Sequence, residues 1–270
     1  MTGRADEVRR RTRRPPALVT VLALVGLAVF VVPLVSLLAR TPWQDLPQLL
    51  TKDVVADALR LSLIASLGAT AISAVIGVPL ALVLARVEFP GRSIVRGLVL
   101  LPLVMPPVVG GAALLFALGR RGVIGEPLYG ATGVVLPFST WGVIIATTFV
   151  AMPFLVITVE GALRNLDPRF EGAAASLGAG RWTVLRRVTL PLIAPSLAAG
   201  LLLTWARALG EFGATITFAG NLQGRTQTLP LAVFVALESD RDTAVALSLI
   251  MVVISLAVLI VLRERWWPSR

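Results

Sequence analysis

The sequence predicts an all-α integral membrane protein with six transmembrane helices and both termini in the cytoplasm. Of its 270 residues, 56% are hydrophobic and 15% are charged, and the mean hydropathy is +0.86. This composition leaves too little polar surface for a water-soluble globule. Six apolar runs reach the length of roughly 20 residues that crosses the hydrocarbon core of a bilayer. The arginines are concentrated in alternate connecting segments, which is typical of a membrane protein with a defined orientation.

The first apolar run, residues 17–39, follows a basic leader formed by residues 1–16. Its length of about 23 residues exceeds the core of a secretory signal, and no convincing small-residue cleavage site ends it, so we expect an anchor helix. The other runs cover residues 58–85, 95–118, 141–159, 192–218 and 243–262. All should be helices, because backbone polar groups in lipid must be satisfied within their own segment. The six spans form one domain, residues 17–262, and a short cytoplasmic tail, residues 263–270, follows.

The orientation follows from the positions of the basic residues. With the N-terminus inside, the inner segments contain 17 of the 25 arginines and lysines, the outer segments contain seven, and Arg207 lies within a span. Because basic loops are retained in the cytoplasm, both termini should be inside. The net charge of +10 is dispersed over segments that flank apolar spans. Contact with anionic headgroups explains this charge better than nucleic-acid binding, which we do not expect.

Several kinds of chemistry are excluded by what the sequence lacks. Its single lysine, Lys52, is not part of a Gly-x-x-x-x-Gly-Lys-Ser/Thr loop, so the chain cannot itself be a P-loop ATPase and we expect no enzymatic activity. It contains no cysteine and no histidine, and we expect no metal site and no cofactor in this chain. The clear charges within spans are Arg207 and Glu211, which lie four residues apart and can pair. A proton-coupled carrier would be expected to have more ionisable groups than these two within its spans to form a proton relay.

The segment of residues 160–191, between the fourth and fifth spans, is rich in small and charged residues and is expected to face the cytoplasm. It contains a spaced pattern formed by Glu171, Gly172, Ala173, Ala174, Gly178, Val188, Leu190 and Pro191. The pattern resembles the coupling loop of binding-protein-dependent ABC importers, which docks the membrane subunit onto an ATPase. Gly172 stands where that family usually has glutamate, and Glu171 lies one residue earlier. The alternative is a connecting loop whose small residues coincide with the pattern by chance.

The third span contains an unusual group of prolines and glycines at its centre. The residues expected to line a translocation path or gate are Met105, Pro106, Pro107, Gly110 and Gly111. Prolines remove backbone hydrogen bonds and bend a helix. Irregular backbone at membrane depth is tolerated only where it is buried in protein or lines a wet cavity. A kinked helix that only packs against its neighbours is the alternative interpretation.

The fifth span combines small residues with polar ones. Ala206, Gly210 and Ala214 recur every four residues, a spacing that lets helices approach closely. Arg207 and Glu211 occupy the adjacent stripe, where a structural or gating pair is favoured over an anion site, because an unpaired charge in the membrane is costly. The neutral polar groups that follow are Thr215, Thr217 and Asn221. For the two hydroxyls, pore lining and hydrogen bonding to helix carbonyls both remain open.

A narrower resemblance rests on residues 206–221 and 225–230, together with residues 101–111 and the turn at residues 119–126. These segments are similar to those of molybdate/tungstate ABC transporter permeases. Sulfate permeases share the Gly-Glu-Phe-Gly of residues 210–213 but usually differ after it, so the following Ala-Thr-Ile-Thr-Phe favours molybdate. The resemblance covers roughly residues 50–262.

The resemblance implies a homodimer of six-span subunits in a bacterial or archaeal cell membrane. In cells with two membranes, this is the inner membrane. It also implies two cytoplasmic ABC ATPase subunits, which bind ATP and magnesium, and an extracytoplasmic protein that delivers a tetrahedral oxyanion for import by alternating access. A sulfate/thiosulfate or other oxyanion permease is the alternative within this class. A self-contained secondary carrier or channel, and a structural or assembly subunit, are alternatives from other classes, but neither accounts for the pattern in residues 172–191.

Overall fold

The structure is a computed structural model that describes residues 16–266, with side chains described as far as residue 261. Nearly all of the basic leader expected at residues 1–16, and the last four residues of the tail, lie outside the described residues. Every regular element within residues 16–266 is helical, so the all-α fold is confirmed. Backbone contacts divide the chain into two units, residues 1–46 and 47–270, which are described separately below.

The first unit contains helix α2 (Ala17–Ala39), whose bounds agree with the first predicted span. None of its residues is buried, and its apolar side chains occupy all sides of the helix, as expected for a helix surrounded by lipid. Just beyond the helix, the Thr41 hydroxyl donates a hydrogen bond of 2.9 Å to the Leu37 carbonyl oxygen. This bond satisfies one of the carbonyls that a helix end leaves without an intrahelical partner.

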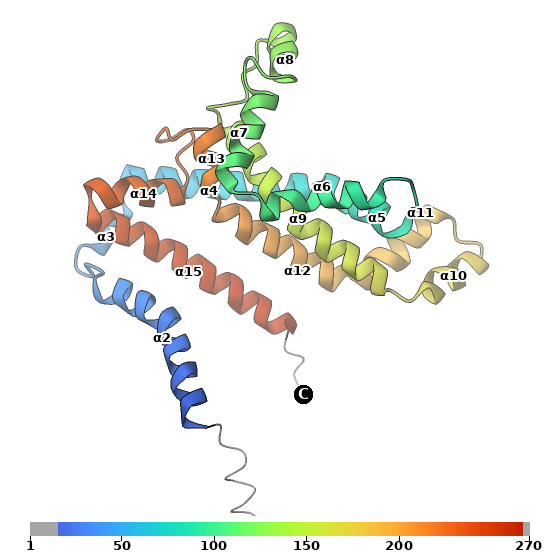
Figure 1. The fold of residues 1–270 in the computed structure, drawn as a ribbon, viewed down its shortest axis with the longest axis horizontal. Coiled ribbons are helices and arrows are strands. Elements are labelled where there is room, and N and C mark those ends of the chain that lie inside the picture. The colour runs from blue at the N-terminus through green and yellow to red at the C-terminus, as the bar shows by residue number, and fades with distance from the viewer. Residues whose placement is uncertain (1–15, 267–270) are drawn as a thin grey trace, which may run out of the picture. The chain divides into compact units, whose positions relative to one another are not determined.

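The second unit contains the remaining helices (Figure 1). They are α3 (Leu46–Leu50), α4 (Asp53–Ile72), η1 (Ser73–Gly77), α5 (Val78–Arg86), α6 (Arg92–Val104), α7 (Pro107–Leu118), α8 (Gly125–Thr132), α9 (Thr140–Asn165), α10 (Pro168–Ser176), α11 (Arg181–Val184), η2 (Leu185–Thr189), α12 (Leu190–Leu209), α13 (Gly213–Phe218), α14 (Leu229–Ser239) and α15 (Arg241–Trp266). The π-helical turns η1 and η2 are continuous with the α-helices around them, so α4 to α5 and α11 to α12 each form one long helix.

Helix α9 is the centre of this unit and packs against α12, α4 and α5 along much of its length (Figure 1). Its apolar residues occupy every side, which is typical of a helix enclosed by others. The Ser139 hydroxyl begins the helix by accepting a 3.1 Å hydrogen bond from the Gly142 amide. Toward its C-terminal half, Leu155, Val159 and Leu163 are fully buried in an apolar cluster with residues of α5 and α12.

Two of the predicted spans are broken into shorter helices. The run predicted as one helix over residues 95–118 is α6 followed by α7, because consecutive prolines at Pro106 and Pro107 cannot donate backbone hydrogen bonds. The run predicted over residues 192–218 ends as α12 at Leu209 and resumes as α13. Helix α14 was not predicted at all. Five helices among the described residues are long and apolar enough to span a membrane, and α6 and α7 together form the remaining predicted span.

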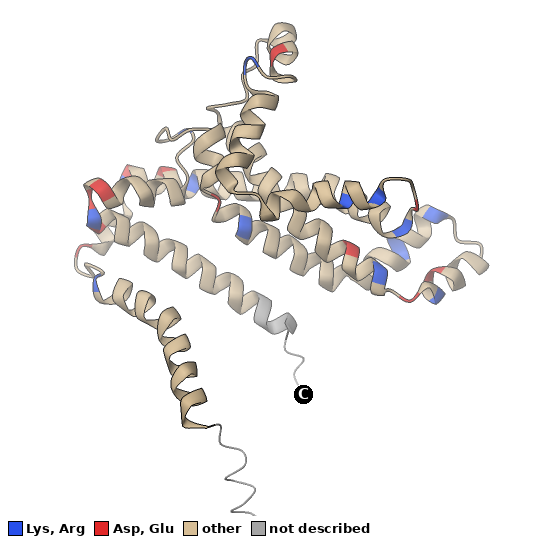
Figure 2. Ribbon diagram, viewed as in Figure 1, with Lys and Arg blue, Asp and Glu red and all other residues tan. Residues whose placement is uncertain are grey.

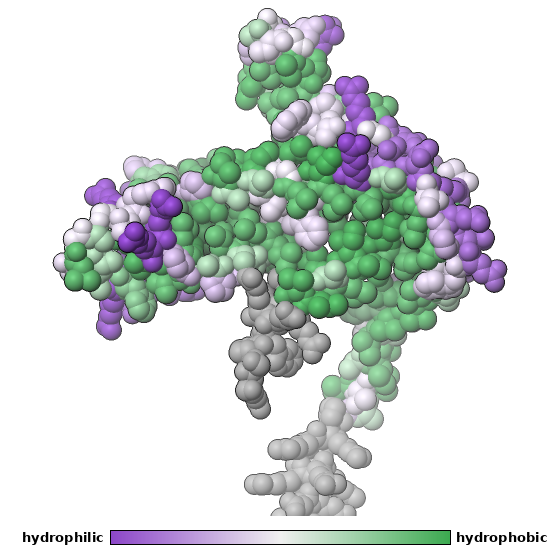
Figure 3. Space-filling model, turned by 180° about the vertical axis from the view of Figure 1, so that it is seen from behind, coloured by the Kyte–Doolittle hydropathy of each residue, from purple (hydrophilic) through white to green (hydrophobic). Residues whose placement is uncertain are grey.

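The charged and apolar residues of the second unit are separated in space. Charged residues gather at the two ends of the long helices and around α8, with few between them (Figure 2). The surface between these ends is mainly apolar in the space-filling view (Figure 3). Large apolar side chains of this unit, including Leu67, Val75 and Leu98, are more than half exposed. An apolar band between polar ends is the surface that a bilayer requires.

Candidate functional site

The break between α6 and α7 lies among the candidate pathway residues of the third predicted span. Met105 has an extended backbone, with ψ at 137°, as is usual for a residue that precedes proline. Helix α7 then begins at Pro107, where a missing N–H costs no intrahelical bond. Gly110 and Gly111 are buried, and a Cβ atom at Gly110 would lie only 3.1 Å from the Phe149 ring of α9.

Helices α7 and α13 approach each other through glycines. A Cβ atom at Gly111 would lie 2.7 Å from both the Ala214 carbonyl oxygen and the Thr217 Cβ atom. A Cβ atom at Gly213 would lie 2.8 Å from the Pro107 Cβ atom. Larger side chains would therefore force the two helices apart. The structure thus brings together the candidate residues of the third and fifth predicted spans, next to the break in each helix.

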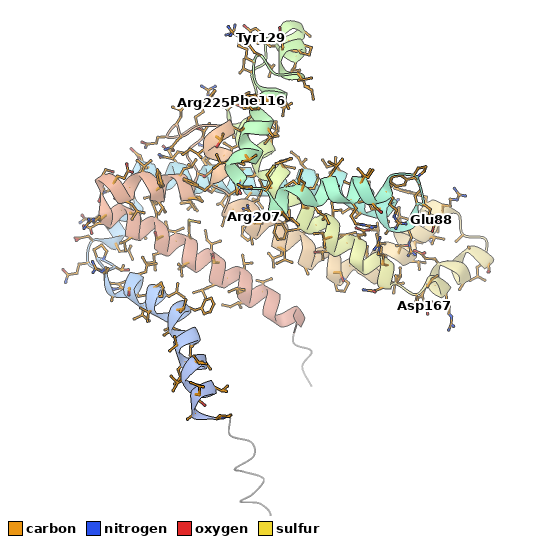
Figure 4. The ribbon with its side chains drawn as sticks, viewed as in Figure 1. Glu88, Phe116, Tyr129, Asp167, Arg207 and Arg225 are labelled. Carbon is orange, nitrogen blue, oxygen red and sulfur yellow. The ribbon has the colours of Figure 1, made fainter. Side chains whose placement is uncertain are left out.

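Glu211 lies between α12 and α13 and is 2% exposed. Its Oε2 atom forms an ion pair of 2.7 Å with the Arg207 guanidinium, which is the pair that the four-residue spacing predicted. Its Oε1 atom accepts a 2.7 Å hydrogen bond from the Ala214 amide in the first turn of α13. One carboxylate therefore links the end of α12 to the start of α13, and Arg207 lies near the middle of the unit (Figure 4).

The three neutral polar candidates differ in their hydrogen bonding. The Thr217 hydroxyl donates to the Gly213 carbonyl oxygen at 2.9 Å, which is the bonding to the helix backbone that the sequence left open. Thr215 Oγ1 and Asn221 Oδ1 are buried and have no hydrogen-bond partner within the described part of the chain. Buried polar atoms are normally paired, so these two are exceptions among the candidates, as are Ser73 Oγ and Thr228 Oγ1 elsewhere in the described residues.

The candidate coupling residues lie mainly on α10. The Asp167 side chain caps this helix by accepting a 2.9 Å hydrogen bond from the Arg169 amide. Just beyond its end, Gly178 has φ at +83°, a left-handed conformation that glycine adopts without strain. Gly172 and Ala173 are exposed, and a Cβ atom at Gly172 would meet nothing within 4 Å. Part of α10 therefore presents small side chains to the outside.

Glu171, in contrast, is directed toward the rest of the chain. Its Oε1 atom accepts hydrogen bonds from the Thr189 hydroxyl at 2.7 Å and from the Arg86 guanidinium at 3.1 Å. Its Oε2 atom is also 3.1 Å from that guanidinium. The sequence placed this carboxylate within the coupling pattern, and it could not show that its partners come from α5 and η2.

Leu190 and Pro191, the last residues of the predicted pattern, are not in a loop. They begin α12, which continues from α11 and η2 without interruption. Leu190 is half-buried and packs on the apolar cluster formed by α5, α9 and α12. The second half of the predicted loop is thus the first part of a long helix, and only residues 166–180 connect two separate helices through α10.

One ion-pair cluster was missed by the sequence analysis. Glu160 on α9 is 6% exposed and pairs with Arg96 of α6 at 2.6 Å and with Arg164 at 2.8 Å. Nearby, the Arg92 side chain donates to the carbonyl oxygens of Leu84 and Ala85 at the end of α5. The spacing of Glu160 and Arg164 was a readable signal, whereas the contact with Arg96 joins positions 64 residues apart. The cluster ties the α5–α6 hairpin to α9.

A second cluster lies at the other end of the unit, where α4 begins near the turn between α14 and α15. The Lys52 ammonium donates to Asp240 Oδ2 at 2.8 Å and to the Thr243 hydroxyl at 2.8 Å. These bonds stabilise the ionised carboxylate, and the hydrogen bond from Lys52, followed by those from Thr243, lowers the pKa of Asp240 well below its usual value of 3.8. The only lysine of the chain thus joins two elements far apart in sequence.

The sequence and the fold were compared with known proteins. Residues 77–265 match the family model described as "Binding-protein-dependent transport system inner membrane component". The chain is 48% identical over 247 residues to the molybdenum transport system permease protein ModB of Mycobacterium tuberculosis, which covers 91% of this chain and 92% of that protein. It is 35% identical over 227 residues to the sulfate transport system permease protein CysT of Escherichia coli, over 84% of this chain and 82% of that protein.

Among solved structures, the fold is similar to a chain of a bacterial alginate ABC transporter in complex with an alginate pentasaccharide-bound periplasmic protein. The TM-score is 0.71, at 19% sequence identity, and the match covers 94% of each chain. At this identity the likeness concerns the fold alone. It extends over nearly the whole chain.

Proposed function

The chain belongs to the family of binding-protein-dependent transport system inner membrane components, and we propose that it is the membrane-spanning subunit of an ATP-driven importer of molybdate. It is a non-catalytic, multi-pass subunit of the cell membrane. Its partners are a second copy of itself, a cytoplasmic ABC ATPase dimer and an extracytoplasmic binding protein. ATP and magnesium are bound by the ATPase, and this chain needs no cofactor of its own.

The observation that carries the choice of molybdate is the 48% identity to a molybdenum permease over 91% of the chain. The identity to a sulfate permease is lower, at 35% over 84% of the chain. Both anions are tetrahedral oxyanions, so sulfate or thiosulfate import is the second candidate. A self-contained carrier is less well supported, because it would not require a segment that docks an ATPase.

For the pathway, we propose that α7 and α13 move as one unit during alternating access. Their contact through Gly111 and Gly213 is too close to slide, whereas each helix is preceded by a break in regular hydrogen bonding. Rigid elements joined at such breaks are the usual way in which transporters change access. The Arg207–Glu211 pair at the second break would set the angle between α12 and α13. Thr215 and Asn221 would offer their free polar atoms to the anion or its hydration water.

The function is tested by reconstituting this chain with its cognate ATPase in liposomes and adding the binding protein. We expect molybdate uptake that requires ATP, and ATP hydrolysis that molybdate-loaded binding protein stimulates. We expect the uptake of sulfate to be at least about tenfold lower than that of molybdate. A tenfold difference corresponds to a difference in binding free energy of only about 1.4 kcal/mol between the two anions. Molybdate uptake by the chain alone, without ATP or partners, would establish the carrier alternative instead.

For docking of the ATPase, we propose the exposed side of α10. Ala173→Trp enlarges an exposed side chain of α10, so the variant should insert and fold normally but fail to co-purify with the ATPase. Gly130→Trp in α8 is the control, because a Cβ atom there meets nothing within 4 Å and α8 lies elsewhere in the fold. Gly178→Trp is less informative, since φ at +83° would strain any larger residue. Normal ATPase binding by Ala173→Trp would exclude this surface.

A further inference from the structure

Helix α10 is held against the rest of the protein by little apolar packing. None of its residues is buried, and its main neighbours are the short elements α11 and η2. A cavity of about 540 Å³ lies between α10, α5, α11 and η2, with Leu82, Gly172, Ala175 and Val184 in its wall. Apolar contacts across such a cavity cannot fix the position of a helix. Other interactions must do so if a displacement of α10 is to reach the membrane helices.

The interaction that spans this cavity is the carboxylate of Glu171. It accepts a hydrogen bond from Thr189, whose side chain is buried, and it pairs with Arg86 in the last turn of α5. The side chains of Arg86 and Glu171 are 33% and 25% exposed, so the pair is partly shielded from water. Hydrogen bonds to a charged acceptor are stronger than neutral ones. The three residues, hereafter the Glu171 clasp, join α10 to two different helices.

Both of these helices lead into the membrane. Arg86 ends the continuous helix of residues 53–86, and Thr189 ends the π-helical turn that runs directly into α12. π-helical turns within longer helices recur at functional positions. At its other end, α12 carries Arg207 and the break before α13. The Glu171 clasp therefore connects α10 to the helix that reaches the proposed gate.

The opposite side of α10 carries exposed apolar side chains. Phe170 is 55% exposed and Leu177 is 90% exposed, and a spacing of seven residues places them on the same side of a helix. A partner that docks on this side meets Phe170, Ala173 and Leu177, while the Glu171 carboxylate is occupied within its own chain. This differs from a contact in which the glutamate binds the ATPase directly.

We propose that Glu171 is a positioning residue that passes the movement of α10 to α5 and α12, and that it is not a docking contact. The inference rests on the proposed function, because it assumes that an ATPase moves α10. Loss of the Glu171 clasp should leave the ATPase bound but should separate ATP hydrolysis from transport. A docking contact would behave in the opposite way, since its loss weakens binding and leaves the transport stoichiometry of the bound complexes unchanged.

The test uses the full complex in liposomes and four variants: Glu171→Gln, Arg86→Gln, the double variant of both, and Thr189→Val. We expect each to bind the ATPase with unchanged affinity, and the molybdate imported per ATP hydrolysed to fall about fivefold, a modest loss in keeping with a partly exposed pair. The double variant should fall no further than either single variant, because residues that act through one contact are not additive. Glu88→Gln, an exposed charge two residues from Arg86 and outside the clasp, should match the wild type.

A second measurement tests whether the Glu171 clasp fixes the position of α10, and it does not depend on transport. Since the chain has no cysteine, spin labels can be placed at Ser176 on α10 and at Val87 after α5. Glu171→Gln and Arg86→Gln should broaden the distance distribution between these labels, and Glu88→Gln should not. An unchanged distribution would overturn the proposal, as would weaker ATPase binding by Glu171→Gln with a normal import ratio. If the wild-type complex imports no molybdate at all, the proposed function fails, whereas the label distances still decide whether the clasp fixes α10.

Discussion

At the scale of single residues, Glu211 shows how one buried carboxylate can serve two neighbours. It neutralises Arg207 and at the same time accepts a hydrogen bond from the Ala214 amide at the start of α13. A buried charge is tolerated only when it is paired and hydrogen-bonded, and Glu211 satisfies both conditions. The same residue type at Glu160 satisfies two arginines at the opposite end of α9 and α12. Carboxylates thus form several of the polar contacts that join helices of this unit.

Glu211→Gln removes the negative charge of this pair but keeps the hydrogen bond, because glutamine retains an oxygen that can accept a hydrogen bond from the Ala214 amide. The variant leaves Arg207 without its counter-charge, and we expect it to lower the stability of the assembled complex by about 3 kcal/mol. Thermal unfolding in detergent measures the loss. Addition of Arg207→Gln should restore part of the stability. If Arg207→Gln alone leaves assembly intact and abolishes anion passage, Arg207 contacts the anion instead.

Asp240 provides a prediction on pH dependence. Its pKa in the folded protein is lower than the usual 3.8, so its contribution to stability is fully present above that value and is lost as the pH falls below it. The stability difference between the wild type and Asp240→Asn should therefore stay constant from about pH 5 to pH 8 and shrink below about pH 4. Melting curves of both proteins across this range check it. A difference that changes near neutral pH would contradict it.

At the scale of elements, the breaks in the third and fifth predicted spans lie next to each other. Helices α7 and α13 begin beside these breaks and are held together by glycines. Close contact of small residues is a common means of helix association in membranes, where the hydrophobic effect does not drive helices together. The pairing explains why two irregular segments, separated by about a hundred residues, form one local structure.

Gly111→Ala tests this contact. The added methyl group would lie 2.7 Å from a backbone oxygen of α13, so the helices must move, and we expect a loss of about 1–3 kcal/mol together with impaired transport. Gly97→Ala in α6 is the control, because its methyl group meets nothing within 4 Å and alanine favours a helix. The control should be at least as stable as the wild type. Equal stability of both variants would mean that α7 and α13 do not depend on this contact.

At the scale of the whole molecule, orientation and energy supply are set by different means. The excess of basic residues in alternate segments orients the spans, and the free energy for transport comes from a partner that this chain only contacts. This division explains the small number of polar groups within the spans. A permease that receives its anion from a binding protein need not hold that anion tightly itself.

Single cysteines test the orientation, because the natural chain contains none. In sealed right-side-out vesicles, Ser176→Cys on α10 should be protected from a membrane-impermeant thiol reagent, and Glu126→Cys in α8 should react with it. Tags at either terminus should also be protected, since 17 basic residues lie on the predicted inner side and seven on the outer side. Reaction at Ser176 in intact vesicles would overturn the predicted topology.

The sequence by itself determined the fold class, the orientation expected for the spans and the positions of the irregular segments. These properties depend on hydropathy, on the placement of arginine and on prolines that cannot donate hydrogen bonds, all of which are local. It also predicted the Arg207–Glu211 pair, because residues four apart on a helix are neighbours. It did not predict α14 or the two separate helices of the third span. It also did not predict that Leu190 and Pro191 begin a helix.

Only the tertiary structure decided which distant residues meet. The contact of Gly111 with Ala214, the pairing of Glu160 with Arg96 and the Glu171 clasp each join positions far apart in the chain. No periodicity encodes such contacts, because they depend on how several helices pack around α9 at once. For that reason the sequence could place Glu171 within the predicted coupling pattern, and only the packed helices show that its carboxylate is turned toward Arg86 and Thr189.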